Sequence, residues 1–222
     1  MSRPLAVLRP EPGNAITAGR IAQLRRPVLR LPLFETRRVD WQPNGAGGFD
    51  ALLLTSANAI RHGGPGLEAL RGLPVLAVGS ATASAANDAG FRIAVTGPGN
   101  AETLIEKAEA AGFRRALHLA GRNRRLREGG IIACIETVYT SDPRDLDEAA
   151  VAQLAGSVAL IHSPRAGARL AELCSETIRC EIAVAAISEN AAMSLGQGWA
   201  RIATAPEPGD FALIETACTL AD

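Results

Sequence analysis

The sequence predicts an α/β protein of two similar Rossmann/flavodoxin-like parallel-sheet domains, joined by a two-stranded linker with a cleft between them. Three observations support this fold class. Short apolar runs alternate with segments of helical spacing, which is typical of βαβ units. The chain also matches itself at an offset of 109 residues. Finally, several predicted strands end in polar residues that begin helices, as ligand-binding α/β sheets do.

The predicted strands are short and apolar, and most are followed by a turn and a helical segment. The first covers Leu5–Leu8 and precedes a helix from Asn14 to Leu24, which we expect Asn14 to cap. The other strands are Val28–Leu33, Ala51–Leu54, Val75–Val78, Ile93–Val95, Ala116–Leu119, Val158–Ile161, Ile182–Ile187 and Ile202–Ala203. This regular alternation predicts parallel sheets.

The repeat is clearest between residues 92–108 and 201–217, where seven of 17 positions are identical without a gap. A second pair, Leu53–Ser56 and Leu160–Ser163, matches at an offset of 107 residues. A repeat of this length predicts two copies of one fold, because a solenoid needs three or more short units.

The two copies are not simply consecutive. The second reaches the C-terminus, so the N-terminal strands must join it, and the β-rich stretches Leu31–Trp41 and Ile135–Ser141 are interpreted as adjacent linker strands. The competing interpretation is a sequential division near residue 140. The preferred division is one domain of residues 1–36 and 144–222, a second of residues 42–134, and linkers at 37–41 and 135–143.

The composition limits the class of protein. The 222 residues suit one large domain or two of about 100 residues each. A net charge of zero gives no overall attraction to nucleic acid or to an anionic membrane. The four cysteines form no C-x-x-C pair, which favours buried thiols in a reducing compartment. With no visible signal peptide and no membrane-length apolar run, we expect a cytoplasmic protein.

Polar residues follow four of the predicted strands, two in each copy. Each group begins a helix, and free N–H groups at a helix start attract phosphate or carboxylate. Ordinary helix capping is the alternative for any one group, and the presence of four favours a shared ligand. The groups are Thr55-Ser56-Ala57-Asn58, Gly79-Ser80-Ala81-Thr82, His162-Ser163-Pro164-Arg165 and Ser188-Glu189-Asn190.

Other candidate residues give weaker signals. An arginine cluster after Ala116–Leu119 is either an anion site or a solvated surface. His62, His118 and His162 are isolated, which favours hydrogen-bonded structural roles, although His162 lies at a strand end. A P-loop, a dinucleotide-binding glycine motif and a nucleophile elbow are all absent from the sequence. The arginines are Arg122, Arg124, Arg125 and Arg127.

Several motifs, taken in order, resemble the uroporphyrinogen-III synthase family from about residue 5 to residue 217. Each motif is weak by itself, but their order and spacing are specific. They are Arg9-Pro10, Pro32-Leu33-Phe34-Glu35, Leu54–Ala59, Val78–Ala83, Gly99–Leu104, Glu136-Thr137-Val138-Tyr139 and His162-Ser163-Pro164.

The resemblance implies a lyase of tetrapyrrole biosynthesis that dehydrates and cyclises hydroxymethylbilane with inversion of ring D, without cofactor or metal. It implies a monomer whose partner is this poly-carboxylate substrate, with no nucleic acid and no membrane. Tyr139 would assist departure of the substrate hydroxyl. The implied substrate contacts are Arg9, Thr55, Ser56, Asn58, Ser80, Thr82, Arg125, Ser163 and Ser188.

One segment departs from the family pattern. Ser188-Glu189-Asn190-Ala191 stands where the family often has Gly-Pro-Thr-Thr, and Ala191 aligns with Thr82 in the repeat. The departure favours an alternative function, a non-catalytic relative that binds tetrapyrroles or small anions. A third class, a periplasmic-type solute receptor, is disfavoured by the missing signal peptide.

Overall fold

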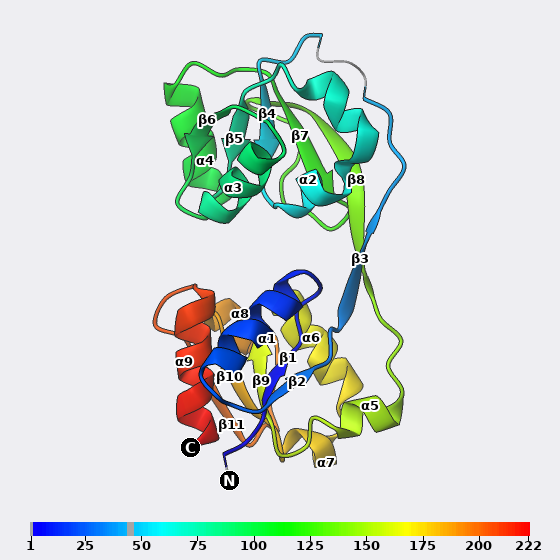
Figure 1. Cartoon of the computed structure of the whole chain (residues 1–222), viewed down its shortest axis with the longest axis vertical. Coiled ribbons are helices and arrows are strands. Elements are labelled where there is room, and N and C mark those ends of the chain that lie inside the picture. Colours follow the sequence, from blue (N-terminus) through cyan, green and yellow to red (C-terminus); the bar gives the residue numbers. More distant parts are fainter. Residues whose placement is uncertain (1, 44–46) are drawn as a thin grey trace. The chain divides into compact units, whose positions relative to one another are not determined.

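The computed structural model describes residues 2–43 and 47–222, so Met1 and residues 44–46 of the expected domains lie outside the described residues. The chain divides into two compact units (Figure 1). Unit 1 is Met1–Glu35 with Asp142–Asp222, and unit 2 is Thr36–Ser141. Each unit is an α/β structure with a largely parallel sheet, which confirms the predicted fold class.

Unit 1 has a five-stranded parallel sheet in the order β11-β10-β9-β1-β2. In chain order this is 2-1-3-4-5, the order of flavodoxin-like sheets. The strands are β1 (Leu5–Val7), β2 (Val28–Arg30), β9 (Val158–Ile161), β10 (Ala183–Ala186) and β11 (Arg201–Thr204). The helices are α1 (Gly13–Gln23), α5 (Glu148–Ala152), α6 (Pro164–Leu173), α7 (Glu176–Arg179), α8 (Glu189–Met193) and α9 (Asp210–Ala221).

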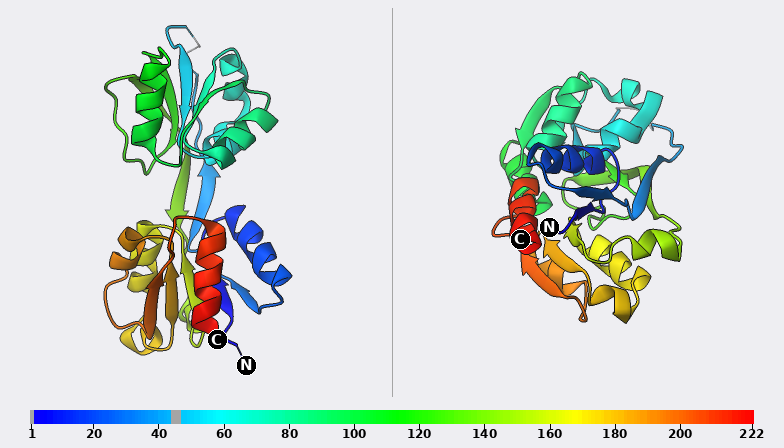
Figure 2. Two further views of the ribbon diagram at one scale, coloured as in Figure 1. Left: turned by 90° about the vertical axis from the view of Figure 1, so that its left-hand side faces the viewer. Right: turned by 60° about the horizontal axis from the view of Figure 1, so that its bottom comes forward.

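The sheet of unit 1 is buried on both faces, as Val- and Ala-rich parallel strands require. Helices α1 and α9 cover one face, where Ile21 and Leu213 pack against Val7. Helices α6 and α8 cover the other, where Leu170 and Ala191 pack (Figure 2). Each face therefore has its own apolar core.

Helix α1 begins differently from the prediction. Its N-cap is Pro12, without a side-chain hydrogen bond. Asn14 is fully buried, and its amide donates to the carbonyl oxygens of Val7 (2.7 Å) and Arg9 (3.1 Å). The prediction that Asn14 caps the helix is wrong, because its side chain instead bonds the backbone at the end of β1.

Unit 2 has a six-stranded sheet in the order β3-β8-β7-β4-β5-β6, parallel from β8 to β6. Helix α4 lies over one face, and α2 and α3 over the other. The strands are β3 (Phe34–Arg38), β4 (Ala51–Leu54), β5 (Val75–Ala77), β6 (Ile93–Thr96), β7 (Ala116–Gly121) and β8 (Ile132–Pro143). The helices are α2 (Asn58–Gly63), the 3-10 helix η1 (Gly64–Leu70), α3 (Ser80–Asp88) and α4 (Ala101–Ala110).

The segments expected as linkers also belong to this sheet. The chain passes from unit 1 to unit 2 within β3 and returns within β8. The two strands are neighbours at one edge, and β8 continues in parallel register with β7 as far as Tyr139. These strands therefore connect the units and also complete the sheet of unit 2.

The repeat has a direct structural counterpart. The order β11-β10-β9-β1-β2 in unit 1 matches β6-β5-β4-β7-β8 in unit 2, and α9 matches α4. Unit 1 is thus a circular permutation, in which the two chain ends meet in the middle of the repeated fold. The backbone N–H of Arg3 donates to the carbonyl of Ala221 at 3.2 Å.

Candidate functional site

In sheets of this order, ligands bind beyond the carboxyl ends of the strands, where neighbouring connections leave in opposite directions. In unit 1 this point lies between β1 and β9, and in unit 2 between β7 and β4. Arg9 and His162 follow the unit 1 strands, while Arg122 and Thr55 follow the unit 2 strands. Side chains at these four strand ends are the first to consider as ligand contacts.

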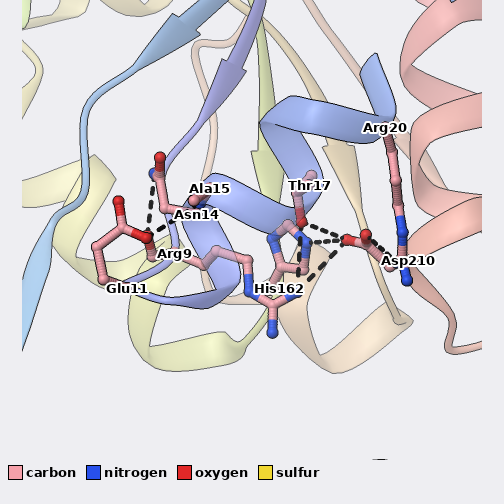
Figure 3. A network of polar contacts seen from close by, with 8 residues as sticks. All are labelled: Arg9, Glu11, Asn14, Ala15, Thr17, Arg20, His162 and Asp210. Carbon is pink, nitrogen blue, oxygen red and sulfur yellow. Dashed lines mark hydrogen bonds and ion pairs between the residues drawn. The ribbon is translucent and has the colours of Figure 1, made fainter. Parts of the chain in front are cut away.

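In unit 1 the strand ends converge on one carboxylate, Asp210 (Figure 3). Its Oδ1 accepts hydrogen bonds from the Thr17 hydroxyl and from His162 Nε2, each at 2.8 Å. Its Oδ2 accepts from Arg20 Nη1 at 2.5 Å. Arg9 Nη1 lies 3.4 Å from Oδ1. These five residues form the Asp210 network.

The network keeps Asp210 ionised, while burial favours the neutral form of His162. Burial alone would raise the pKa of Asp210, but the hydrogen bonds from His162, Thr17 and Arg20 outweigh it and hold that pKa well below its usual range. Burial also lowers the pKa of His162, in spite of the Asp210 carboxylate. A neutral imidazole that donates through Nε2 to the ionised carboxylate agrees with the lowered pKa of His162 and with the lowered pKa of Asp210.

Three of the predicted ligand contacts in unit 1 already have partners inside the protein. Arg9 belongs to the Asp210 network, with about a third of its side chain exposed. Ser163 caps α6, where its Oγ accepts from the N–H of Ala166 at 3.2 Å. Ser188 caps α8 in the same way, through the N–H of Ala191 at 3.4 Å. For these two serines the capping alternative holds, although each hydroxyl retains its own hydrogen as a donor.

In unit 2 the polar residues after β4 have hydrogen-bond partners within the unit. Thr55 Oγ1 lies 3.1 Å from Nε2 of His118. The Ser56 hydroxyl accepts from the N–H of Asn58 at 3.2 Å, and the amide oxygen of Asn58 accepts from Arg61 at 3.1 Å. Neither Thr55 nor Ser56 caps α2, which has no side-chain cap.

After β5 the two predicted contacts differ in exposure. Ser80 begins α3 and is exposed to solvent. Thr82 is only 6% exposed, and its counterpart in the repeat, Ala191, is fully buried. Unit 1 therefore lacks a hydroxyl at Ala191, and the matching hydroxyl of unit 2, on Thr82, belongs to a nearly buried side chain.

Tyr139 lies against the end of β7. It pairs in register with Gly121, where an added Cβ would lie 2.7 Å from Cζ of the tyrosine ring. His62 of α2 stacks on the ring with a centroid distance of 6.0 Å. Burial and the neighbouring Arg61 lower the pKa of His62. A glycine is needed opposite the ring, because any side chain there would push Tyr139 away.

The loop between β7 and β8 borders a hollow of about 400 Å³, the basic hollow. Arg125, the predicted contact, is exposed but does not line it. Arg124 donates to Thr137 Oγ1 at 2.9 Å, which draws the loop along β8. The lining residues are Arg122, Arg124, Leu126, Arg127, Glu128 and Ile135.

The described residues contain neither a cluster of metal ligands nor a membrane-spanning helix. Within residues 2–43 and 47–222, no group of three or more His, Cys, Asp and Glu side chains is arranged to hold a metal ion. Over the same residues, none of the helices has both the length and the apolar character needed to cross a membrane.

Comparison with known proteins places this fold in a family. The family model described as Uroporphyrinogen-III synthase HemD matches residues 17–215. The chain belongs to the uroporphyrinogen-III synthase family. The family resemblance of the motifs is thereby confirmed over most of the chain.

Solved structures support the same fold. The crystal structure of uroporphyrinogen-III synthetase from Helicobacter pylori 26695 matches with a TM-score of 0.67 at 16% identity, covering 98% of this chain and 99% of that one. A mutant uroporphyrinogen III synthase from the extremely thermophilic bacterium Thermus thermophilus matches with a TM-score of 0.56 at 14% identity, covering 99% and 100%. No curated protein matches the chain in sequence.

Several residues of this uroporphyrinogen-III synthase family member escaped prediction. The sequence does not single out Asp210, Thr17 or Arg20, and it favours a structural role for His118. Asp210 aligns with Ala101 in the repeat, so the sequence does contain one signal, a charge present in only one copy. The pairing of Thr17 with Asp210 spans 193 residues and has no local pattern.

Proposed function

We propose that the chain is a uroporphyrinogen-III synthase, which dehydrates and cyclises hydroxymethylbilane with inversion of ring D. Membership of the family over residues 17–215 carries the proposal. The position of Tyr139 supports it, because the phenol ring is held over Gly121 at the carboxyl end of β7, next to the strand that leads to Thr55.

The chemistry proposed for Tyr139 is mild acid assistance. The C–O bond of the hydroxymethyl group breaks, and the hydroxyl leaves as water while a pyrrole N–H gives up its proton, which produces an azafulvene. The phenol donates a hydrogen bond to the departing oxygen and lowers the barrier without a net transfer of its proton. The azafulvene carbon then bonds to the substituted carbon of ring D, giving a spirocycle that fragments and recloses.

The proposed substrate contacts are donors suited to carboxylates. Arg9 and Arg125 provide guanidinium groups. The capping hydroxyls of Ser163 and Ser188 each accept from their own helix and still have a hydrogen to donate. The remaining proposed contacts belong to unit 2 and are Thr55, Ser56, Asn58, Ser80 and Thr82.

Product analysis tests the activity. Hydroxymethylbilane is supplied to the protein, and the uroporphyrinogen isomers are separated. We expect the type III isomer, whereas spontaneous closure without ring inversion gives type I. If only type I forms, at the rate found without protein, the chain is not a synthase.

The variant Tyr139→Phe tests the acid role. The phenyl ring keeps the packing over Gly121 while the donor is lost, so we expect kcat to fall by about 10²-fold with KM little changed. The fluorescence of Trp41, buried in the same unit, checks that the fold is intact. An unchanged kcat removes Tyr139 from the mechanism.

One observation favours a second candidate, a non-catalytic relative that binds tetrapyrroles or small anions. Glu189 is exposed at the start of α8, where its negative charge opposes a carboxylate ligand. This candidate predicts binding of uroporphyrin without formation of the type III isomer. Replacing Glu189 by Gln would then tighten binding and still give no activity.

A further inference from the structure

A histidine lies at the centre of the unit 2 sheet. His118 of β7 is fully buried, in register with Leu53 of β4 and Ile135 of β8. Leu53 aligns with Leu160 in the repeat, and Leu160 is in register with Val7, so the counterpart of His118 in unit 1 is a valine. Burying an imidazole where the sister unit has a valine is costly without compensating hydrogen bonds.

His118 forms one side-chain hydrogen bond. Its Nε2 lies 3.1 Å from Thr55 Oγ1, while Nδ1 is buried without a partner among the described residues. Burial lowers the pKa of His118 to about 4, so the ring is neutral and has a single N–H. A buried N–H without an acceptor is rarer than a buried acceptor without a donor, which favours the tautomer with its hydrogen on Nε2. In that tautomer the imidazole donates to the Thr55 oxygen.

We propose that His118 is a positioning residue that turns the Thr55 hydroxyl into a donor for a carboxylate of the ligand. Because the Thr55 oxygen accepts from the imidazole, its own hydrogen must point elsewhere. No other hydrogen bond of the Thr55 side chain is found among residues 2–43 and 47–222. The inference rests on the proposed function, in which Thr55 contacts a carboxylated substrate.

In unit 1 the side chain that corresponds to Thr55 has a hydrogen-bond acceptor supplied by the protein. His162 is the counterpart of Thr55 in the repeat, and it donates to Asp210. The counterpart of Asp210 in unit 2 is Ala101, whose side chain has no hydrogen-bond acceptor. The donor after β9 thus meets a carboxylate of the protein itself, and we infer that the donor after β4 is left for a carboxylate of the ligand.

Nitrogen NMR of the intact chain tests the hydrogen bond directly. With three histidines, ¹⁵N-labelled imidazoles can be assigned by substitution. We expect Nε2 of His118 to be protonated and Nδ1 to be bare at neutral pH. Thr55→Val should shift the His118 Nε2 signal and leave His162 unchanged. The opposite tautomer, or no shift in Thr55→Val, would overturn the inference.

Steady-state kinetics test the positioning role. His118→Leu removes the donor at similar volume, and Thr55→Val removes the hydroxyl. We expect each to lower kcat/KM about tenfold, mainly by raising KM, since one hydrogen bond is lost. The double variant should be no worse than either single variant, because both act through one contact. His118→Gln, which keeps an N–H donor, and Thr55→Ser, which keeps the hydroxyl, should recover most of the loss.

The outcomes separate this inference from the proposed function. If His118→Leu equals the wild type, or if the two single losses multiply in the double variant, His118 does not position Thr55. If the wild type makes no type III isomer, the proposed function fails, and the same variants are compared by their Kd for uroporphyrin. Equal binding by His118→Leu and the wild type then overturns the inference, and a matching tenfold loss in both single variants supports it.

Discussion

The two units share one strand order and use it differently. In unit 1 the strand ends meet Asp210, a carboxylate supplied by the protein, which Thr17, Arg20 and His162 bond. In unit 2 the corresponding position is Ala101. One copy of the fold uses the strand-end His162 to tie its β9 to a carboxylate near the C-terminal helix, while the other has an alanine at the position of that carboxylate.

The crossovers that follow the matching strands also differ. Residues 8–27 join β1 to β2 and contain α1, which packs on the sheet. Residues 122–131 join β7 to β8 without a helix, and Leu126 from this loop packs against the same face of its own sheet. The basic hollow thus borders a crossover that has no helix in unit 2. Where unit 1 has the apolar covering of α1, unit 2 has Leu126 together with the arginines of this loop.

A pair of tryptophans allows the units to be followed separately. Trp41 belongs to unit 2 and donates to the carbonyl of Gly63, and Trp199 belongs to unit 1 and donates to the carbonyl of Leu195. Replacing either by Phe leaves a single fluorophore that reports one unit. Denaturant unfolding followed through each fluorophore then measures the stability of that unit alone.

The largest expected effect concerns acid stability of unit 2. The pKa of His118 is about 4 in the folded chain and about 6.5 when exposed, so the unfolded state takes up a proton first as the pH falls. The contribution of the neutral His118 to the free energy of unfolding is fully present above pH 6.5. It is lost as the pH falls to 4, and the loss is about 3 kcal/mol in total. In denaturant unfolding followed by Trp41 fluorescence, His118→Leu should not show this loss of stability between pH 6.5 and pH 4, whereas the wild type should. A parallel pH dependence in both proteins would contradict the buried neutral histidine.

Asp210→Asn should destabilise unit 1 by about 2 kcal/mol, because a largely buried carboxylate beside the guanidinium groups of Arg9 and Arg20 loses its charge. The Trp199 transition should shift to lower denaturant while the Trp41 transition stays in place. The control is Asp222→Asn, which breaks the solvent-exposed pair with Arg26 and should leave both transitions unchanged. Equal shifts in the two variants would mean that the Asp210 network stabilises nothing.

Gly121→Ala should cost about 1.5 kcal/mol in unit 2, because the new Cβ would meet the Tyr139 ring at 2.7 Å. The ring must then move, so formation of the type III isomer should fall as well. Gly72→Ala, where an added Cβ meets nothing within 4 Å, is the control for adding a methyl group. Full activity of Gly121→Ala would show that the ring position is unimportant.

Thr82→Ala should have the smallest effect, a loss of about 1 kcal/mol or less with activity within about twofold of the wild type. The Thr82 side chain is nearly buried, and its counterpart Ala191 already lacks the hydroxyl. A large rise in KM for Thr82→Ala would show instead that this hydroxyl reaches the ligand, and the two units would then differ at this helix also.

The fold was largely predictable because its signals are local or repeated. Apolar runs such as Ala51–Leu54 are strands, and the match of residues 92–108 with 201–217 corresponds to β6-α4 and β11-α9. The site was harder to predict. A strand-end serine that caps a helix, as Ser163 does, looks the same in sequence as one that binds a ligand. The Thr55–His118 contact joins residues 63 apart, and no periodicity marks it.

The circular permutation of unit 1 sets the order in which the units can be completed during synthesis. All strands of unit 2 except the start of β3 and the end of β8 lie within Thr36–Ser141, so its sheet is available once that stretch has left the ribosome. Strand β1 and helix α1 are made before unit 2, yet strand β9, which pairs with β1, and helix α9, which packs on the same face as α1, are made after it. At about 5–20 residues per second, the N-terminal segment waits for several seconds after unit 2 is complete. The nascent chain therefore carries a finished inner domain before its outer one can close.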